Sequence, residues 1–133
     1  MGAWEDYEAR RKVEREQEAQ KRREVINGAE VGMGASYGIG SDCYPYFVVG
    51  VNRFKSGAKK GEVKEVLVKS ARYREGFHGD WLNAVVGNEK FEVNENADVR
   101  VFSVRKNYRL VEVGQEYGHL SVGQCRDYRD PHF

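Results

Sequence analysis

The chain has 133 residues, and its 22 Lys and Arg against 21 Asp and Glu give a formal net charge of +1. So small a net charge excludes a strong overall field toward nucleic acid or a membrane surface. No apolar run approaches the ~20 residues of a membrane span, and the N-terminus lacks the apolar stretch of a signal peptide. The two cysteines form neither a disulfide framework nor a zinc pattern, so reduced thiols in an intracellular protein are expected.

Residues 1–27 are predicted to form a charged N-terminal helix. Fourteen of the twenty positions from 5 to 24 carry a charge, and Asn27-Gly28 supplies a helix end. The apolar side chains form no continuous stripe, although packing of an apolar face supplies most helix stability. The segment is therefore either a solvated or partly disordered leader, or an oligomerisation arm that crosses a neighbouring subunit. The anchors of such an arm would be Trp4, Tyr7, Val25 and Ile26.

Residues 28–133 are predicted to form one β-rich ligand-binding domain, because Val and aromatic residues dominate its apolar positions. Residues 44–51 form a continuous apolar run typical of a strand buried on both faces, and residues 54–61 are typical of a polar hairpin turn. Further strands are expected at 62–69, 98–104, 108–113 and 120–122, with short ones inside the less regular segment 71–97. The predicted fold class is α+β, mainly β: a small antiparallel sheet or open barrel of five to seven strands with an N-terminal helix.

Glycines at positions 32, 34, 38 and 40 form a glycine-rich stretch before the first long strand. The stretch lacks the Lys-Ser/Thr ending of a phosphate-binding loop. It also precedes a strand rather than a helix, so no helix N-terminus helps to hold a phosphate. We expect a tight backbone turn here that lets a ligand or a subunit approach closely.

The two end motifs, residues 31–46 and 126–133, are rich in aromatic residues, and the second also contains arginines. Such residues are suited to binding a flat, charged ligand. A guanidinium group matches a phosphate with a planar fork, and aromatic rings stack on bases. The alternative is that the arginines of the second motif only pair with Asp127 and Asp130. The candidate ligand-binding residues are Asp42, Tyr44, Phe102, Arg105, Arg109, Arg126, Tyr128 and Arg129.

Catalytic residues, metal ligands and cofactors are not predicted. His78, His119 and His132 have no metal-ligand spacing. Four aspartates could supply acid or base, but none is combined with a nucleophile and a base in a recognisable pattern: Asp42, Asp80, Asp127 and Asp130. A binding function therefore ranks above an enzymatic one.

Four motifs resemble a group of small phage-borne proteins that is similar to the first described family of Thoeris anti-defence proteins. They are Val-Gly-Met-Gly-Ala-Ser at 31–36, Ser-Asp-Cys-Tyr-Pro-Tyr at 41–46, Val-Arg-Lys-Asn-Tyr at 104–108 and Arg-Asp-Tyr-Arg-Asp-Pro-His-Phe at 126–133. The resemblance covers residues 31–55 and 99–133. Cys43 departs from it, because the family motif has arginine at that position.

The resemblance implies a sponge that binds cyclic nucleotide immune signals without cleaving them, in the cytoplasm of the infected bacterial host. It also implies a symmetric hexamer whose pockets between subunits hold glycocyclic ADP-ribose, with cyclic di- or trinucleotides bound by some members at a separate site. In that picture the four arginines hold phosphates, while Tyr44, Phe102 and Tyr128 stack on the base. Asp42 accepts hydrogen bonds from ribose hydroxyls or orients an arginine.

Two other classes of protein remain open. A nucleic-acid-binding β-barrel of phage origin fits the basic residues interleaved with aromatic ones, although near-zero net charge counts against it. A structural or assembly protein would use its helix to dock to a partner, and it would bind no small molecule.

Overall fold

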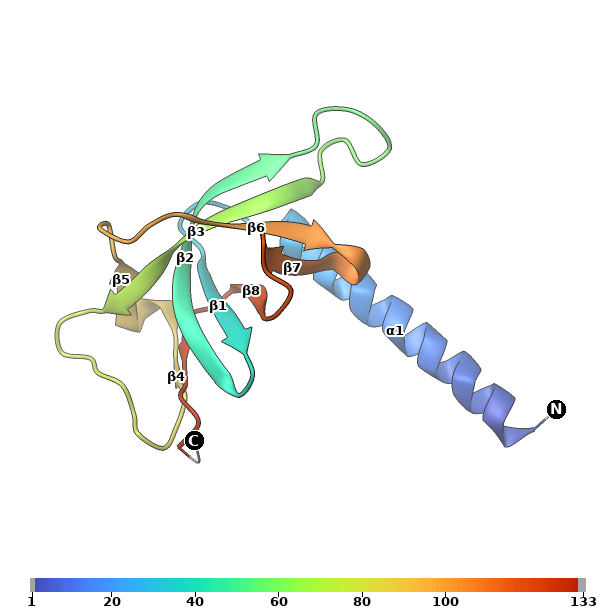
Figure 1. Cartoon of the computed structure of the whole chain (residues 1–133), viewed down its shortest axis with the longest axis horizontal. Coiled ribbons are helices and arrows are strands. Elements are labelled where there is room, and N and C mark those ends of the chain that lie inside the picture. The colour runs from blue at the N-terminus through green and yellow to red at the C-terminus, as the bar shows by residue number, and fades with distance from the viewer. Residues whose placement is uncertain (1, 132–133) are drawn as a thin grey trace.

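The computed structural model describes residues 2–131 and consists of one long helix attached to a barrel of strands (Figure 1). The α+β, mainly β architecture confirms the predicted fold class. Within the described residues, no helix is long and apolar enough to cross a membrane. The elements are α1 (Ala3–Asn27), β1 (Gly34–Ile39), β2 (Asp42–Arg53), β3 (Val63–Tyr73), β4 (Val85–Val86), the 3₁₀ turn η1 (Asn88–Lys90), β5 (Phe91–Val93), β6 (Arg100–Arg105), the 3₁₀ turn η2 (Lys106–Tyr108), β7 (Arg109–Glu112), β8 (His119–Gly123) and β9 (Arg126–Asp127).

Six strands close into a barrel in the order β2-β1-β8-β7-β6-β3, with β3 pairing back onto β2. Neighbouring strands are antiparallel, and β5 extends the sheet at the far end of β3. The two longest strands, β2 and β3, change register between Val48 and Gly50. Such an irregularity bends a strand and increases its twist, which a barrel needs in order to close. The small strands β4 and β9 form a separate two-stranded sheet.

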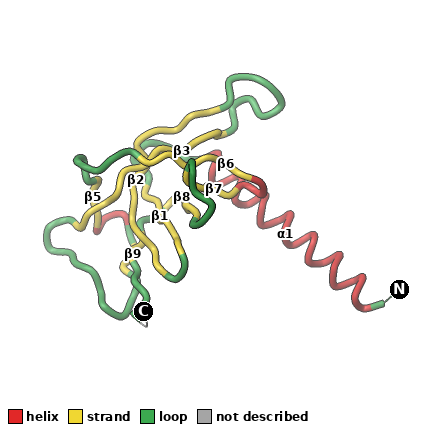
Figure 2. The backbone as a smooth tube through the Cα atoms, viewed as in Figure 1, coloured by secondary structure: helices red, strands yellow, loops and turns green. Residues whose placement is uncertain are grey.

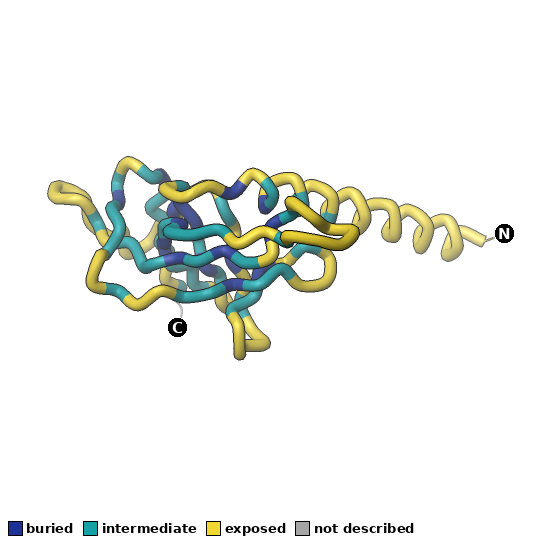
Figure 3. Tube along the Cα trace, turned by 90° about the horizontal axis from the view of Figure 1, so that it is seen from above, coloured by how far each residue is buried: buried dark blue, intermediate teal, exposed yellow. Residues whose placement is uncertain are grey.

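The core lies inside the barrel and follows the two-residue alternation of its strands (Figure 3). Val66 and Val68 on β3 are fully buried, as is Val48 on β2. Residues on the outer face of β2, such as Phe47 and Val49, are only half-buried. The apolar run at 44–51 is therefore a strand with one buried face, rather than the two faces that its composition predicts.

The helix α1 joins the barrel only through its last turns. Every residue from Ala3 to Glu18 is exposed, whereas Ile26 is buried in the core (Figure 3). The final turns pack against η2 and β8, and the rest of the helix projects away from the barrel (Figure 1). The position of the helix and its end at Asn27 agree with the sequence prediction.

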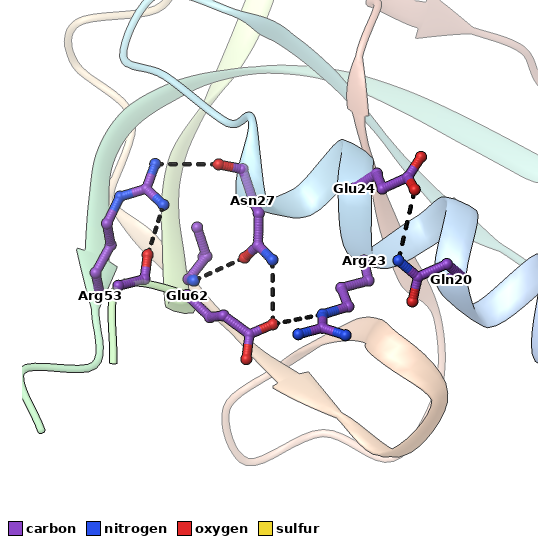
Figure 4. Close-up of polar contacts among 8 residues, drawn as sticks. Gln20, Arg23, Glu24, Asn27, Arg53 and Glu62 are labelled. Atoms are coloured by element: carbon purple, nitrogen blue, oxygen red, sulfur yellow. Dashed lines mark hydrogen bonds and ion pairs between the residues drawn. The ribbon is translucent and has the colours of Figure 1, made fainter. Parts of the chain in front are cut away.

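A polar network around Glu62 fixes the end of α1 to the start of β3 (Figure 4). Arg23 Nε lies 2.7 Å from Glu62 Oε1, and the Asn27 side-chain amide donates to the same oxygen at 3.2 Å. These hydrogen bonds hold the pKa of Glu62 below its ordinary value. Asn27 Oδ1 also accepts from the backbone nitrogen of Val63 at 2.9 Å, and the Arg53 guanidinium donates to the Asn27 carbonyl at 3.2 Å.

The glycine-rich stretch is mostly a strand, which corrects the predicted turn. Residues 34–39 form β1, which pairs with β2 on one side and β8 on the other. The close approach itself is present at Gly34, where a Cβ atom would lie 2.6 Å from Asn88 Cγ and 2.9 Å from the Cys125 nitrogen. The partner is another part of the same chain, so Gly34 serves the packing of the barrel.

Candidate functional site

The two end motifs meet within a single chain. The backbone nitrogen of Cys43 donates to the Tyr128 carbonyl at 2.8 Å, and the Tyr128 nitrogen donates to the Cys43 carbonyl at 3.0 Å. This isolated bridge joins the start of β2 to the segment after β9. It brings four of the candidate residues together, namely Asp42, Tyr44, Tyr128 and Arg129.

Arg129 is held in one orientation by the residues around it. Its guanidinium carbon lies 3.7 Å from the centroid of the Tyr44 ring, and its Nη1 donates to the Cys43 carbonyl at 2.6 Å. The same nitrogen forms an ion pair with Asp127. Asp42 Oδ1 accepts from the Asp130 backbone nitrogen at 2.9 Å, so Asp42 fixes the turn that follows the arginine.

Asp127 links the arginine to the barrel. Its second carboxylate oxygen accepts a hydrogen bond from the Tyr73 hydroxyl on β3. Burial and the neighbouring Asp127 carboxylate raise the pKa of Tyr73 well above its ordinary value, so the phenol stays a donor. The predicted pairing of arginine with aspartate is therefore present for Arg129, and it orients the guanidinium group.

A pocket of about 520 Å³ separates the second end motif from the loop between β3 and β4, and we call it the terminal pocket. Residues 127–131 line one wall, and Gly79, Asp80 and Trp81 line the other. Figure 2 shows this long loop reaching back to the region of β9 and the C-terminal end. The Trp81 side chain is 79% exposed, so its indole is available to a ligand.

Asp80 is fixed by its own turn. Its Oδ1 accepts from the backbone nitrogens of Leu82 at 2.9 Å and Asn83 at 3.2 Å. These hydrogen bonds hold the pKa of Asp80 below its ordinary value, so the carboxylate is ionised at neutral pH. The terminal pocket thus combines an oriented arginine, an oriented carboxylate and an exposed indole.

The other predicted site residues lie elsewhere or are buried. Arg126 is exposed on β9 next to the terminal pocket, where its backbone pairs with β4. Arg105 and Arg109 are paired across the β6–β7 hairpin. This hairpin lies beside α1 and away from the C-terminal segment that carries the second end motif (Figure 1). Phe102 has no exposed surface and packs against Tyr37 with ring centroids 5.5 Å apart. Its stacking role is thus corrected to a core role, because alternation along β6 points its ring into the barrel.

Sequence reasoning missed Trp81, which lines the terminal pocket, and Arg100, which lies outside it on β6. Arg100 Nη2 lies 2.5 Å from Glu112 Oε1, and its guanidinium carbon lies 4.8 Å from the Tyr37 ring centroid. Alternation on β6 places Arg100 on the same face as Phe102, which could have revealed it. Trp81 follows no periodic pattern, and only its large apolar surface in a polar loop marks it.

Glu112 makes the stability of the barrel depend on pH. Hydrogen bonds from Arg100 hold the Glu112 pKa below its ordinary value, so the stabilisation is present above about pH 4.3 and is lost as pH falls through the folded pKa. Glu112→Gln should lower the free energy of unfolding by about 1–3 kcal/mol at pH 7, and the difference from wild type should shrink in acid. Urea denaturation at several pH values measures both. The exposed Glu116→Gln serves as control, and a pH-independent cost for Glu112→Gln would contradict the prediction.

Within residues 2–131, the histidines and cysteines form no cluster. His78 Nδ1 lies 3.0 Å from the Gly79 carbonyl, His119 is exposed on β8, and His132 lies outside the described residues. In the part of the chain that the structure describes, no three His, Cys, Asp or Glu side chains gather as a metal site. Cys43 and Cys125 are free thiols, and burial raises the pKa of Cys125 to about 11.

The fold and the terminal pocket define a small closed barrel with a helical arm and a surface pocket of arginine, aspartate and aromatic residues. No family model matches the chain, and neither a curated protein nor a solved structure matches it.

Proposed function

We propose that the protein binds a cyclic nucleotide signal in the terminal pocket and sequesters it without cleaving it. The observation that carries the proposal is the arrangement of Arg129. All of its hydrogen bonds to described residues use Nη1, which leaves Nη2 and Nε able to donate to a phosphate. The resemblance to Thoeris anti-defence sponges supports the same ligand class.

The rest of the pocket suits the other parts of such a ligand. The exposed Trp81 ring offers a face on which a base can stack. The ionised Asp80 carboxylate lines the same wall and accepts hydrogen bonds from ribose hydroxyls. In the proposal Asp42 helps to orient Arg129 indirectly, because its Oδ1 accepts a hydrogen bond from the backbone nitrogen of Asp130, the next residue.

Sequestration requires tight binding at a fixed stoichiometry and no turnover. The proposal includes assembly of several copies, up to the hexamer that the resemblance implies, with pockets completed between subunits. The cytoplasm of an infected bacterium is the proposed place of action, as the motif resemblance implies.

Calorimetric titration of the purified chain with glycocyclic ADP-ribose tests the proposal. We expect Arg129→Ala to weaken binding by about 10–100-fold, as the loss of charge-assisted hydrogen bonds implies, and Trp81→Ala to weaken it by about 5–150-fold. Arg105→Ala is the matched control, since this exposed arginine lies outside the terminal pocket and should bind like wild type.

Three results would count against the proposal. One is wild-type affinity in the Arg129→Ala variant. Another is recovery of a nucleotide of altered mass after heat release, which would point to an enzyme. The third is salt-sensitive retention of a single-stranded oligonucleotide in place of the small molecule, which would favour the nucleic-acid-binding barrel.

A further inference from the structure

The junction between β7 and β8 is the least paired in the barrel. These strands pair at one position, Leu110 with Leu120, whereas each of the other five junctions of the ring pairs at four or more positions. The last turns of α1 lie beside this junction, and they bury Ile26 in the core. Strands that separate next to a helix leave a space on the barrel that neither element fills.

Part of this space is a groove of about 360 Å³ between the last turns of α1 and strands β7 and β8, and we call it the helix groove. Val25, Leu120 and Val122 line it with aliphatic surface. Val25 is 52% exposed although the next residue, Ile26, is buried, so the helix leaves apolar surface uncovered at this end. The volume of the groove lies in the range of small-molecule sites.

Among the described residues that line the helix groove, the charged ones are all basic and none is acidic. Lys21 on α1 and Arg109 on β7 are both exposed, so each of the two walls carries a positive charge. The nearest acids along α1, Glu18 and Glu24, do not line the groove, and Glu24 lies 3.5 Å from the Gln20 side-chain amide (Figure 4). The charged and titratable lining residues are Lys21, Arg22, Arg109 and His119.

We infer that the helix groove binds a small amphipathic anion, a free molecule with one carboxylate or similar headgroup on an aliphatic chain. The chain lies on the aliphatic surface, where the burial of each methylene group is favourable, and the headgroup reaches Lys21 and Arg109. The helix groove and the terminal pocket share no lining residue, so this site is separate from the proposed nucleotide site and does not depend on it.

A free molecule suits the helix groove better than a bilayer or a protein segment does. Leu120 is only 5% exposed, so the floor is recessed between the helix and the strands, where a flat membrane surface does not reach. The groove also has the size of a small-molecule site rather than the extent of a protein interface.

Calorimetric titration of the full chain with decanoate, below the concentration at which decanoate forms micelles, tests the inference. We expect one decanoate to bind per chain. Each methylene group removed, as in octanoate, should weaken binding by up to about fourfold. Decylammonium has a similar chain and the opposite charge, so it should bind about tenfold more weakly than decanoate or worse.

Reversing the charge of the rim should reverse this preference. The variant Lys21→Glu with Arg109→Glu is expected to bind decylammonium more tightly than decanoate, because both walls then carry a negative charge. A control with the same charge change on the β2–β3 turn, Lys55→Glu with Lys60→Glu, should keep the preference of wild type.

Val25→Ser tests the aliphatic surface and should weaken decanoate binding by about threefold to tenfold. Val31→Ser is the matched control, since Val31 is 68% exposed and does not line the groove. Circular dichroism confirms that each variant is folded.

Three results would overturn the inference. They are a failure of decanoate to bind, equal affinity for decanoate and decylammonium, and a wild-type preference in the variant with Lys21→Glu and Arg109→Glu. If the chain bound vesicles that contain phosphatidylglycerol but did not bind decanoate, the groove would instead belong to a membrane-binding surface. None of these results bears on nucleotide binding in the terminal pocket.

Discussion

Phe102→Ala is expected to lower the free energy of unfolding by about 3–5 kcal/mol, the usual cost of truncating a buried phenylalanine. Phe102 is fully buried on β6, and its ring lies edge-on to Tyr37 with centroids 5.5 Å apart. The Arg100 guanidinium carbon lies 5.7 Å from the same ring centroid. Removing the ring leaves a cavity beneath the Arg100–Glu112 pair, and urea denaturation measures the loss as a lower midpoint.

Phe77→Ala is the matched control for this prediction. The Phe77 side chain is 44% exposed on the loop between β3 and β4, so its truncation should change the unfolding free energy by less than about 0.5 kcal/mol. The two variants also separate stability from binding at residue 102. A Phe102→Ala protein with a wild-type midpoint and weakened nucleotide binding would restore the stacking role that the sequence suggested.

Gly34→Ala is expected to cost about 2–4 kcal/mol, although it adds only a methyl group. The new carbon would lie 2.6 Å from Asn88 Cγ and 2.9 Å from the Cys125 nitrogen. Asn88 Oδ1 accepts from that nitrogen at 2.7 Å, and its amide donates to the Gly123 carbonyl at 3.2 Å. The methyl group must therefore displace Asn88 and leave the buried Cys125 amide without its acceptor.

Gly38→Ala provides the comparison from the same strand. A Cβ atom on Gly38 would meet its nearest neighbour, His119 Cε1, at 3.7 Å, which is ordinary contact. Its effect on the thermal midpoint should be small, and alanine reduces the freedom of the unfolded chain. Equal losses for the two variants would mean that strand propensity, rather than the approach of Asn88, decides the cost.

Local patterns in the sequence predicted most of the elements of the fold. The charge run and Asn27-Gly28 located α1, and turn residues located the hairpin before β3 and the one between β6 and β7. β1 escaped prediction because its glycines have no side chains to alternate. Closure of the barrel was not predicted either. It depends on a register change at residues 48–50, which amino-acid composition does not indicate.

The candidate site could be predicted only where each of the two end motifs carries residues that are unusual in type. Tyr44 and Arg129 stood out by type, and the structure stacks one on the other. Arg109 stood out equally, but it lies in a groove between the last turns of α1 and strands β7 and β8. It was misplaced because the sequence does not give the distance in space between two motifs. Phe102 was misassigned because a half-buried and a fully buried ring look alike in an alternating strand.

The strand order also bears on the folding rate. β1 lies between β2, its neighbour in the chain, and β8, so Gly34 must find Gly123 before the ring of strands is complete. Contacts so distant in sequence carry a large loop-closure entropy and slow folding. Until that pairing forms, β1 has an open edge that can pair with another chain. The protein should therefore be most prone to aggregation while it is being synthesised, before β8 has emerged.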